Sequence, residues 1–466
     1  MLKSPAIIHE IYPGRYDLVS LLEKDPERYP YLLETTAVST ESRTGNFDIL
    51  FAFPQQRLIK HYDNTVTFDD ELCPGKQFLA ELDHVWEKVG VDSELKSSKR
   101  FPSIPFYGGW FLYLGYELVN EIEPSVNINQ PDTVLPLAFA TRIPATIVYE
   151  YAQDQTHVIV ENRYQHLLED MRSALKQTNQ SFITTDKILV NSINEETPSV
   201  YTNSIEKILK FIHDGDVFQV NLSRQWEAEL NESATDVELY RKLRAANPAP
   251  FSALVKFDES SIVSSSPERL FCTHNKKIET RPIAGTRPRG LTEDNDAELQ
   301  SELISNFKER AEHIMLIDLE RNDLGRICKP GTIQVDEFMA LESYAHVHHI
   351  VSNVSGEMQD DITPGQIIKA IFPGGTITGC PKVRCMEIIK ELEQTARGAY
   401  TGSLGFLNHN GDMDLNILIR SLTVKDKHVT FRAGAGIVAD SIADKELEET
   451  RAKAKGMIVA LQGSNR

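Results

Sequence analysis

The pattern of hydrophobic and polar positions divides the chain into two regions. Residues 1–176 are rich in short apolar segments bounded by turn residues, such as residues 47–53 and 110–114, and we predict strands there. A polar stretch over residues 177–199, with one apolar patch at residues 188–190, is predicted to be a connector or an edge element. From residue 200 to 462, helix-like and strand-like segments alternate without the regular rhythm of a βαβ fold, which favours an α+β architecture.

A helix is predicted over residues 306–325. Ala311, Met315 and Leu319 recur every four residues and mark the face that we expect to be buried. Gly325 is a typical residue for ending such a helix.

A second helix is predicted to begin near Asp440, after a strand that starts at Val429. Ser441 and Asp444 form an N-terminal capping pattern. The positions expected to face the core are Ala443, Leu447, Thr450, Ala454, Met457 and Leu461.

Each helix carries two glutamates at a spacing of three, which places both on one face. The pairs are Glu309 with Glu312 and Glu446 with Glu449, the latter beside Lys453. If the helices face each other the four carboxylates converge, and like charges ~4 Å apart repel by about 4 kcal/mol at an effective dielectric of 20. Mg²⁺ would remove that repulsion, because it prefers oxygen ligands. The alternative is two solvated helix faces, as on a non-catalytic acidic module that binds Mg²⁺ or a partner.

Other positions indicate sites for an anion or for proton transfer. Glu268 follows a proline where a strand is expected to end. Arg420 closes the apolar segment 415–420, which has the pattern of a strand, and an arginine buried there would require an anion. Gly434 and Gly436 are predicted at a strand-to-helix turn, whose exposed N–H groups suit a carboxylate or phosphate, although a tight turn alone also explains them.

Two further segments concentrate polar chemistry. The segment TRPIAGTRPRG, residues 280–290, is predicted to be a rigid cationic loop because it holds two prolines, two glycines and three arginines. His348 and His349 lie in an apolar strand-like segment, so one of them must point inward, either as an acid or base or as an ordinary core residue.

Composition narrows the range of partners. The chain has 466 residues, with 68 Asp and Glu against 49 Lys and Arg, which gives a net charge of −19. A field of that sign repels phosphate backbones and anionic membrane surfaces, so we expect binding to neither nucleic acid nor membrane. The five cysteines form no CxxC pair, the apolar start is too short for a signal peptide, and no run approaches a membrane span. We therefore expect a cytoplasmic protein.

Several motifs together resemble the chorismate-utilising enzymes. These include the large subunits of anthranilate synthase and aminodeoxychorismate synthase and their isochorismate- and salicylate-forming relatives. From about residue 200 to 460, in the family's order, the chain holds SSSPERLF, TRPIAGTRPRG, RAEHIMLIDLERNDLGR, HHIVS, FPGGTITGCPKVRCMEIIKELE, NILIR, and AGAGIVADS followed by ELEETRAKA. The resemblance implies one interleaved α+β structure of two packed antiparallel sheets flanked by helices.

The resemblance also implies roles for residues of this chain. Glu268 matches the acid near the departing C4 hydroxyl of chorismate, and His349 matches the histidine beside the ring. The positions matching the family's Mg²⁺ ligands are Glu312 and Glu449, with Glu309 and Glu446 in or behind the coordination sphere. The positions matching groups that hold the substrate carboxylates or line the pocket are Arg420, Tyr400, Lys453, the backbone near Gly434, Thr286 and Thr376.

Gln219 indicates the nucleophile. Relatives that add water look to have a lysine at this position as a general base. Glutamine cannot deprotonate water near pH 7, whereas ammonia needs no such base. The resemblance therefore implies amination of chorismate, with ammonia supplied by a separate glutamine amidotransferase subunit, because this chain shows no glutaminase elbow.

The residues leave two products open. Segments such as DVFQVNL at 216–222 and PAPFSA at 248–253 look like the branch that forms aminodeoxychorismate, the precursor of 4-aminobenzoate and folate, and we favour that branch. Ala284 points the other way. One well-known kind of aminodeoxychorismate enzyme has a nucleophilic lysine in a PIKGT loop, whereas PIAGT is usual for anthranilate synthases.

The segment LLET, residues 32–35, resembles the LLES of a tryptophan-binding pocket. Leu33, Glu34 and Thr35 are therefore candidates for a tryptophan site, either for feedback control or for a structural ligand. An ordinary strand end is the alternative interpretation.

Overall fold

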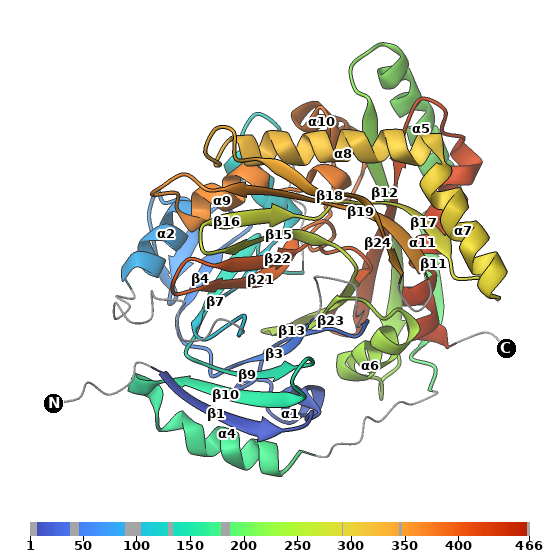
Figure 1. Ribbon diagram of the computed structural model, residues 1–466. Helices are drawn as coiled ribbons and strands as arrows, with labels where there is room; N and C mark the ends of the chain where they lie inside the picture. Colours follow the sequence, from blue (N-terminus) through green and yellow to red (C-terminus); the bar gives the residue numbers. More distant parts are fainter. Residues whose placement is uncertain are drawn as a thin grey trace.

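The computed structural model describes residues 7–37, 46–88, 104–128, 134–178, 187–290, 292–343 and 347–463, without the side chains of Thr286 and Lys308. Within these ranges the chain forms two antiparallel sheets, sheet A and sheet B, which pack against each other with helices outside them (Figure 1). The predicted α+β fold is therefore confirmed.

Sheet A has twelve strands in the described residues, and β2 pairs with β13 so that Leu32 lies opposite Leu254. In spatial order the strands are β1 (Ile7–Pro13), β10 (Gln155–Glu161), β9 (Ala145–Glu150), β3 (Phe47–Ala52), β2 (Tyr31–Glu34), β13 (Phe251–Phe257), β14 (Ser260–Ser266), β23 (Ser421–Lys425), β24 (His428–Ile437), β12 (Gln219–Leu230) and β11 (Val190–Glu195), with β20 (Gly379–Cys380) paired to the start of β12.

Sheet B also has twelve strands in the described residues, and β7 pairs with β21 so that Leu112 lies opposite Gly405. Both sheets thus combine strands from the two regions that the sequence separates. In spatial order the strands are β17 (Ile283–Pro288), β19 (Val347–Glu357), β16 (Lys277–Thr280), β15 (Arg269–His274), β22 (Met413–Asn416), β21 (Ser403–Asn408), β7 (Gly109–Leu114), β8 (Ala138–Ile143), β4 (Arg57–Lys60), β5 (Val66–Phe68) and β6 (Glu71–Leu72), with β18 (Gln334–Ser343) paired to β19.

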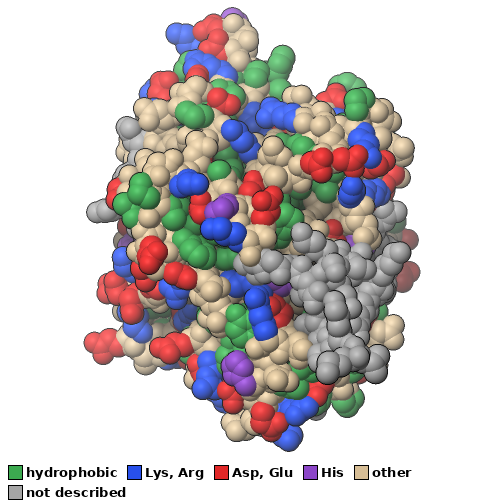
Figure 2. All heavy atoms as spheres, turned by 90° about the vertical axis from the view of Figure 1, so that its left-hand side faces the viewer, with side chains coloured by type: hydrophobic (Ala, Val, Ile, Leu, Met, Phe, Trp, Pro, Cys, Tyr) green, Lys and Arg blue, Asp and Glu red, His purple; other side chains and the backbone are tan. Residues whose placement is uncertain are grey.

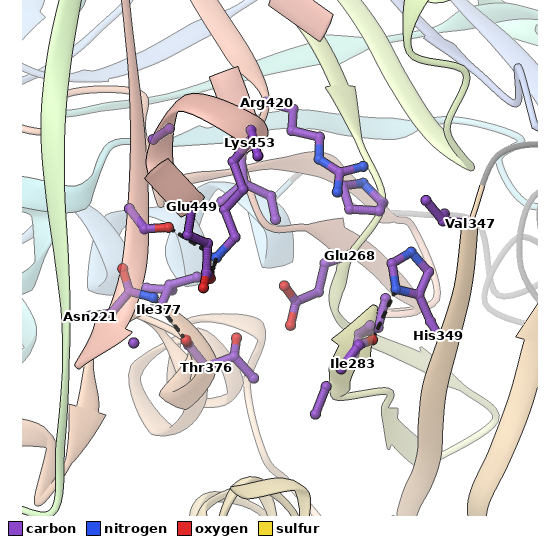
Figure 3. Close-up of a pocket in the computed structure, with 18 of the residues that line it drawn as sticks. Asn221, Glu268, Ile283, Val347, His349, Thr376, Ile377, Arg420, Glu449 and Lys453 are labelled. Atoms are coloured by element: carbon purple, nitrogen blue, oxygen red, sulfur yellow. Dashed lines mark hydrogen bonds and ion pairs between the residues drawn. The ribbon is translucent and has the colours of Figure 1, made fainter. Parts of the chain in front are cut away.

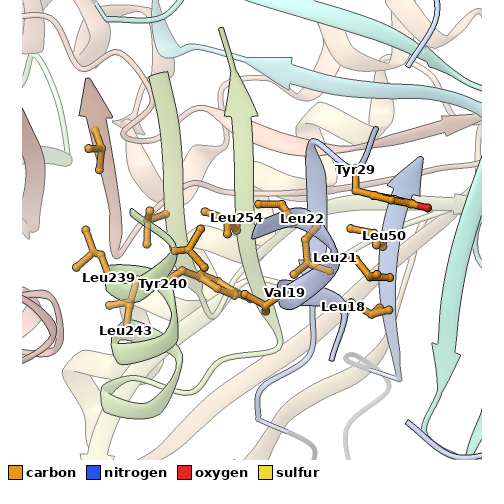
Figure 4. Packing of buried hydrophobic residues seen from close by; sticks show 14 of the residues in the cluster. Leu18, Val19, Leu21, Leu22, Tyr29, Leu50, Leu239, Tyr240, Leu243 and Leu254 are labelled. Atoms are coloured by element: carbon orange, nitrogen blue, oxygen red, sulfur yellow. The ribbon is translucent and has the colours of Figure 1, made fainter. Parts of the chain in front are cut away.

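Helices cover the outer faces of both sheets (Figure 1). The α-helices are α1 (Leu18–Lys24), α2 (Phe78–Lys88), α3 (Val119–Ile122), α4 (Leu167–Lys176), α5 (Pro198–His213), α6 (Asp236–Ala246), α7 (Glu293–Ser305), α8 (Phe307–Gly325), α9 (Pro364–Ile371), α10 (Lys382–Leu392) and α11 (Ala443–Gln462). On sheet A, leucines of α1 and α6 meet Leu50 and Leu254 of the strands (Figure 4). Between the sheets, aromatic side chains fill the core, and the ring of Tyr31 stacks on that of Phe111 at 4.2 Å.

Helix α8 begins and ends where the sequence predicts, but it buries a different face. Ala311 is exposed, whereas His313, Leu316 and Leu324 are buried. Met315 and Leu319 of the predicted stripe are half-buried, and the stripe is only partly right because the buried face of α8 also contains charged side chains, those of Glu320 and Asp323, so hydrophobicity does not mark it. In α11 the predicted stripe from Leu447 to Leu461 is buried, while Ala443 is only half-buried.

Four other local predictions are corrected. Residues 283–288 form strand β17 and not a loop, with a bulge at Gly285 between its pairings to β19. Gly434 and Gly436 lie inside β24 and not at a turn, because β24 continues to Ile437.

Arg420 lies outside any strand, since β22 ends at Asn416 and β23 begins at Ser421. Ser441 does not cap α11; Ile442 is the N-cap residue, and the Ser441 hydroxyl instead accepts a hydrogen bond of 3.0 Å from the N–H of Val438.

On the face of the molecule shown in Figure 2, acidic and basic side chains are interspersed, so this surface is neither uniformly negative nor uniformly positive. Across the described ranges, none of the helices combines the length and the apolar character required to span a membrane.

Candidate active site

A cavity of about 810 Å³ lies where the ends of the two sheets meet helices α8 and α11 (Figure 3). Strands β12 and β24 of sheet A and strands β17 and β19 of sheet B contribute to its wall. The cavity brings together the predicted residues Glu268, His349, Arg420, Tyr400, Gly434, Lys453, Thr376, Gln219, Glu309, Glu312, Glu446 and Glu449. The side chain of Thr286 lies outside the described part of the chain; its backbone is paired with His349 in β17 and β19.

The two helices present their glutamates to this cavity, as their spacing of three predicts. Glu309 and Glu312 come from the first turns of α8, whose N-cap residue Asn306 accepts a hydrogen bond of 3.2 Å from the N–H of Glu309. Glu446 and Glu449 come from the first turns of α11. The four carboxylates therefore face the same cavity from the N-terminal ends of the two helices. The partial positive charge of these helix ends stabilises the nearby carboxylates.

Protein groups of this cavity balance the carboxylates. Arg287 forms an ion pair of 2.7 Å with Glu309, and Lys453 forms one of 2.9 Å with Glu449. The amide nitrogen of Gln219 donates a hydrogen bond of 2.9 Å to Glu312. These contacts lower the cost of placing several anions in one cavity.

The donor set fits a hard cation, although no three acidic, His or Cys side chains of the described residues are arranged to hold a metal together. All four glutamates supply oxygen, and Oε2 of Glu309 is buried without a hydrogen-bond partner among the described residues. Gly285, at φ +62, permits this arrangement, since a Cβ there would lie 2.2 Å from that oxygen.

Glu268 is a buried carboxyl group on the opposite wall. It lies between β14 and β15, with 6% of its surface exposed, and its carbonyl accepts a hydrogen bond of 3.0 Å from Ile417. Burial raises the pKa of Glu268 to about 7, although Thr376, Lys453 and Arg420 act in the opposite direction. Glu268 can therefore hold a proton near neutral pH and donate it within the cavity.

Arg420 brings positive charge to the same wall and aims toward Glu268 and His349 (Figure 3). Its guanidinium forms no ion pair or hydrogen bond within the described ranges, and burial lowers the pKa of Arg420. Its backbone has φ +52, which costs on the order of 1 kcal/mol in a residue other than glycine. A half-buried arginine without a carboxylate partner among the described residues has the chemistry of an anion-binding group.

His349 is neutral at physiological pH. Burial and the charge of Arg420 lower the pKa of His349 to about 4. Its Nδ1 lies 3.3 Å from the carbonyl oxygen of Gly285, which requires the proton on Nδ1 and leaves Nε2 as an acceptor. The neighbouring His348 points away from the cavity and contacts Asp296 at 2.9 Å and Ser343 at 2.8 Å.

Residues 36–459 match the family described as chorismate binding enzyme. The chain belongs to the chorismate-binding enzyme family.

Individual members of this family resemble the chain over most of its length. The "Anthranilate synthase component I-like protein" of Synechocystis is 41% identical over 385 residues, 79% of this chain and 76% of the relative. "Aminodeoxychorismate synthase component 1" of Bacillus subtilis is 41% identical over 407 residues, 85% of each chain. The crystal structure of anthranilate synthase component I from Streptococcus pneumoniae TIGR4 superposes with a TM-score of 0.78 at 30% identity and covers 90% of this chain and 94% of that one. Similarity alone therefore does not decide between the two products.

The tryptophan candidates lie on and beside β2, and protein groups engage their polar atoms. Glu34 is buried, accepts a hydrogen bond of 2.6 Å from Tyr240 and pairs with Arg244 at 3.0 Å. The Thr35 hydroxyl donates to the carbonyl of Phe47 at 3.1 Å, and Leu33 is half-buried. A tryptophan site at these residues stays a prediction.

Sequence reasoning missed two polar residues of the cavity in this chorismate-binding enzyme. The sequence placed Arg287 only in a predicted cationic loop, whereas in the structure Arg287 forms an ion pair with Glu309. Asn221 lies two residues after Gln219 in β12 and lines the same wall. The alternation of side chains along a strand could have identified Asn221, because residues i and i+2 share a face.

The turn that carries Tyr400 is held by a residue from the N-terminal region. Glu117, in the short 3₁₀ helix Tyr116–Leu118, is only 2% exposed. Its carboxylate accepts hydrogen bonds from the N–H groups of Arg397 at 2.8 Å and Gly398 at 3.1 Å. Glu117 thereby fixes the backbone three residues before Tyr400, a wall residue of the cavity.

We expect Glu117→Leu to lower the free energy of unfolding by about 3 kcal/mol, because it leaves two buried N–H groups unpaired. It should also raise the KM for chorismate by about tenfold through movement of the Tyr400 turn. Urea unfolding and steady-state kinetics measure the two effects. Glu117→Gln keeps an acceptor oxygen and should restore most of both, whereas an unchanged KM in Glu117→Leu would restrict this residue to a structural role.

Proposed function

We propose that this chain is the chorismate-aminating component of an aminodeoxychorismate synthase. It would replace the C4 hydroxyl of chorismate with ammonia, giving 4-amino-4-deoxychorismate and water, the route to 4-aminobenzoate and folate. The observation that carries the proposal is one cavity that combines a protonatable Glu268, an unpaired Arg420 and an amide, Gln219, in place of a lysine base.

Glu312 and Glu449 would hold Mg²⁺, with Glu309 and Glu446 assisting from the same helix faces. When bound, Mg²⁺ would neutralise the ring carboxylate of the substrate and draw electron density from the ring. Lys453, which pairs with Glu449 at 2.9 Å, would place its ammonium beside this site for a substrate carboxylate.

Residues of the chain account for the other requirements of the reaction. Arg420 and the Tyr400 hydroxyl would bind and orient the substrate carboxylates, and Thr376 lines the wall next to Glu268. Glu268 would protonate the departing C4 hydroxyl, so that water leaves instead of hydroxide. His349 would contact the ring through its unprotonated Nε2, because Nδ1–H is engaged by the Gly285 carbonyl.

Ammonia would come from a second protein. The two sequence relatives described above are named as component I or component 1, which implies a partner component, and we propose a glutamine amidotransferase for that role. Ammonium salts at alkaline pH supply free ammonia without this partner, so the isolated chain can be assayed alone.

Anthranilate synthase activity is the second candidate, and Ala284 favours it. The methyl side chain of Ala284 lines the cavity and cannot form a covalent bond to C2 of the substrate. Lys453 is the one lysine that lines the cavity in the described residues, and it is bound to Glu449 and to the Gly434 carbonyl at 3.0 Å. Ammonia would then add at C2 directly, and loss of water and pyruvate would give anthranilate.

Product analysis distinguishes these functions. The chain is incubated with chorismate, Mg²⁺ and ammonium chloride at alkaline pH. A product that yields 4-aminobenzoate only after an aminodeoxychorismate lyase is added would support the proposal. Anthranilate fluorescence without the lyase would replace it with the second candidate. Chorismate left unconsumed both at alkaline pH and near pH ~7, where Glu268 keeps its proton, would favour a non-catalytic acidic module that binds Mg²⁺ or a partner.

Arg420→Met should raise the KM for chorismate by about a hundredfold, because it removes the half-buried guanidinium that we assign to a substrate carboxylate. The apolar side chain of methionine keeps the volume of the arginine stem. Steady-state kinetics and chorismate binding by fluorescence titration measure the change. A KM within threefold of the parent chain would show that Arg420 binds no substrate carboxylate.

A further inference from the structure

The β12 wall of the cavity holds two buried amide oxygens that lack a partner. Oε1 of Gln219 and Oδ1 of Asn221 accept no hydrogen bond from any described residue. Both side chains line the cavity, because they occupy alternate positions of one strand (Figure 3 labels Asn221). Only 4% of the Gln219 surface is exposed.

The orientation of both amides is fixed by their nitrogen atoms. The Gln219 nitrogen donates to the Glu312 carboxylate at 2.9 Å, and the Asn221 nitrogen donates to the carbonyl of Thr376 at 3.4 Å. Turning either amide over would place two acceptor oxygens against each other. The oxygens, and not the nitrogens, are therefore left without partners.

Two glycines of the neighbouring strand β24 make room for these amides. A Cβ at Gly436 would lie 2.2 Å from the Gln219 nitrogen, and a Cβ at Gly434 would lie 2.9 Å from Oδ1 of Asn221. Both side chains thus extend over a strip of β24 that carries no side chains. The wall is shaped to hold these two amides in place.

A buried acceptor without a donor costs about 1–3 kcal/mol, which a ligand with N–H groups would recover. Chorismate offers mainly acceptors, its two carboxylates, and a single hydroxyl donor. Ammonia offers three N–H donors, and when these face the amide oxygens its lone pair points away from the wall. A carboxylate side chain would instead bind ammonium, whose nitrogen has no lone pair for attack.

We propose that the side-chain oxygens of Gln219 and Asn221 form the binding site for free ammonia, the second substrate. This site rests on the proposed amination of chorismate. It adds a second function to Gln219, which also contacts the candidate metal ligand Glu312, and it assigns a function to Asn221. Binding through N–H groups keeps the ammonia nucleophilic and holds it beside Thr376, which also borders Glu268.

Asn221→Leu tests the site, because leucine has a similar volume and no acceptor. Gln219 is less suitable, since its replacement would also release Glu312. We expect the KM for free ammonia to rise about tenfold, the loss of one hydrogen bond to a buried group, with the KM for chorismate within twofold of the parent chain. Initial rates are measured against ammonia at saturating chorismate, and against chorismate at saturating ammonia.

Asn231→Leu is the matched control, because Asn231 directly follows β12 and does not line the cavity; both KM values should be unchanged. If Asn221→Leu shows no cooperative thermal unfolding, Asn221→Ala replaces it with the same expected result. An unchanged KM for ammonia, or a rise in the KM for chorismate alone, would overturn the ammonia site and leave the proposed function intact. A parent chain that forms no aminated product would overturn both.

Discussion

Replacing Glu268 with glutamine is expected to lower kcat for chorismate turnover by about a thousandfold. Glutamine matches the shape of a protonated glutamate but cannot transfer a proton to the departing hydroxyl. Steady-state kinetics measure the loss, and fluorescence titration should show chorismate affinity within about threefold of the parent chain, because binding is assigned to other residues. A decrease of less than tenfold would remove Glu268 from proton transfer.

The pH dependence gives an independent measurement on the same variant. The pKa of Glu268 is raised by burial from 4.5 to about 7, so its carboxyl is protonated below that pH. At constant free ammonia, kcat should fall about tenfold per pH unit above pH ~7 in the parent chain and stay level in Glu268→Gln.

The raised pKa of Glu268 should also contribute a loss of about 3 kcal/mol of stability between pH ~4.5 and ~7, because the folded state then binds more protons at Glu268 than the unfolded state does. Glu268→Gln should lack this contribution and keep that of other buried acids such as Glu320.

Glu320 supplies the matched control for Glu268. It is also buried, and burial raises the pKa of Glu320 to about 8, but its side chain does not line the cavity. Glu320→Gln should therefore change the pH dependence of stability in the same direction and leave kcat within about threefold. An equal loss of kcat in both variants would indicate a general effect of removing buried acids.

Replacing Glu449 with alanine is expected to lower Mg²⁺-dependent turnover by at least a hundredfold, since a direct ligand should matter no less than the groups that support one. It also leaves Lys453 without its partner at 2.9 Å. Calorimetric titration with Mg²⁺ alone measures the affinity for the ion, which should fall by a similar factor in Glu449→Ala.

Glu448→Ala is the control for this change. The Glu448 carboxylate is 68% exposed, pairs with Arg451 at 2.6 Å and points away from the cavity wall. Glu448→Ala changes the same helix turn and the same net charge as Glu449→Ala. Because Glu448 does not line the cavity, turnover and Mg²⁺ affinity should be unchanged. Normal turnover in Glu449→Ala would eliminate the proposed magnesium site, whatever the behaviour of the control.

Helical spacing made the four glutamates of the site predictable from the sequence. Glu309 with Glu312, and Glu446 with Glu449, share faces for geometric reasons that hold in any α-helix, and both pairs line the cavity. The sequence did not reveal which face of α8 is buried, because that face carries His313 and other polar groups whose partners come from distant strands, such as Ser352 at 2.7 Å.

The remaining errors arise from tertiary structure. The segment 283–288, predicted to be a loop from its proline and glycine content, forms strand β17 because its backbone pairs with β19. The φ of +52 at Arg420 has no local sequence signal, since arginine seldom adopts that conformation. Asn221 was missed for a different reason: its position two residues after Gln219 was readable, but its role depends on Gly434 and Gly436 of another strand.

The pairing of β2 with β13, and of β7 with β21, has a consequence for synthesis on the ribosome. The strand that contains Tyr31 cannot pair with β13 until Val255 has been translated, and the strand that contains Leu112 cannot pair with β21 until Gly405 has been translated. Early strands therefore emerge long before their partners, and most of the chain must be translated before either layer can close. We expect folding to be slow and to finish after translation, as in other proteins dominated by contacts between distant residues.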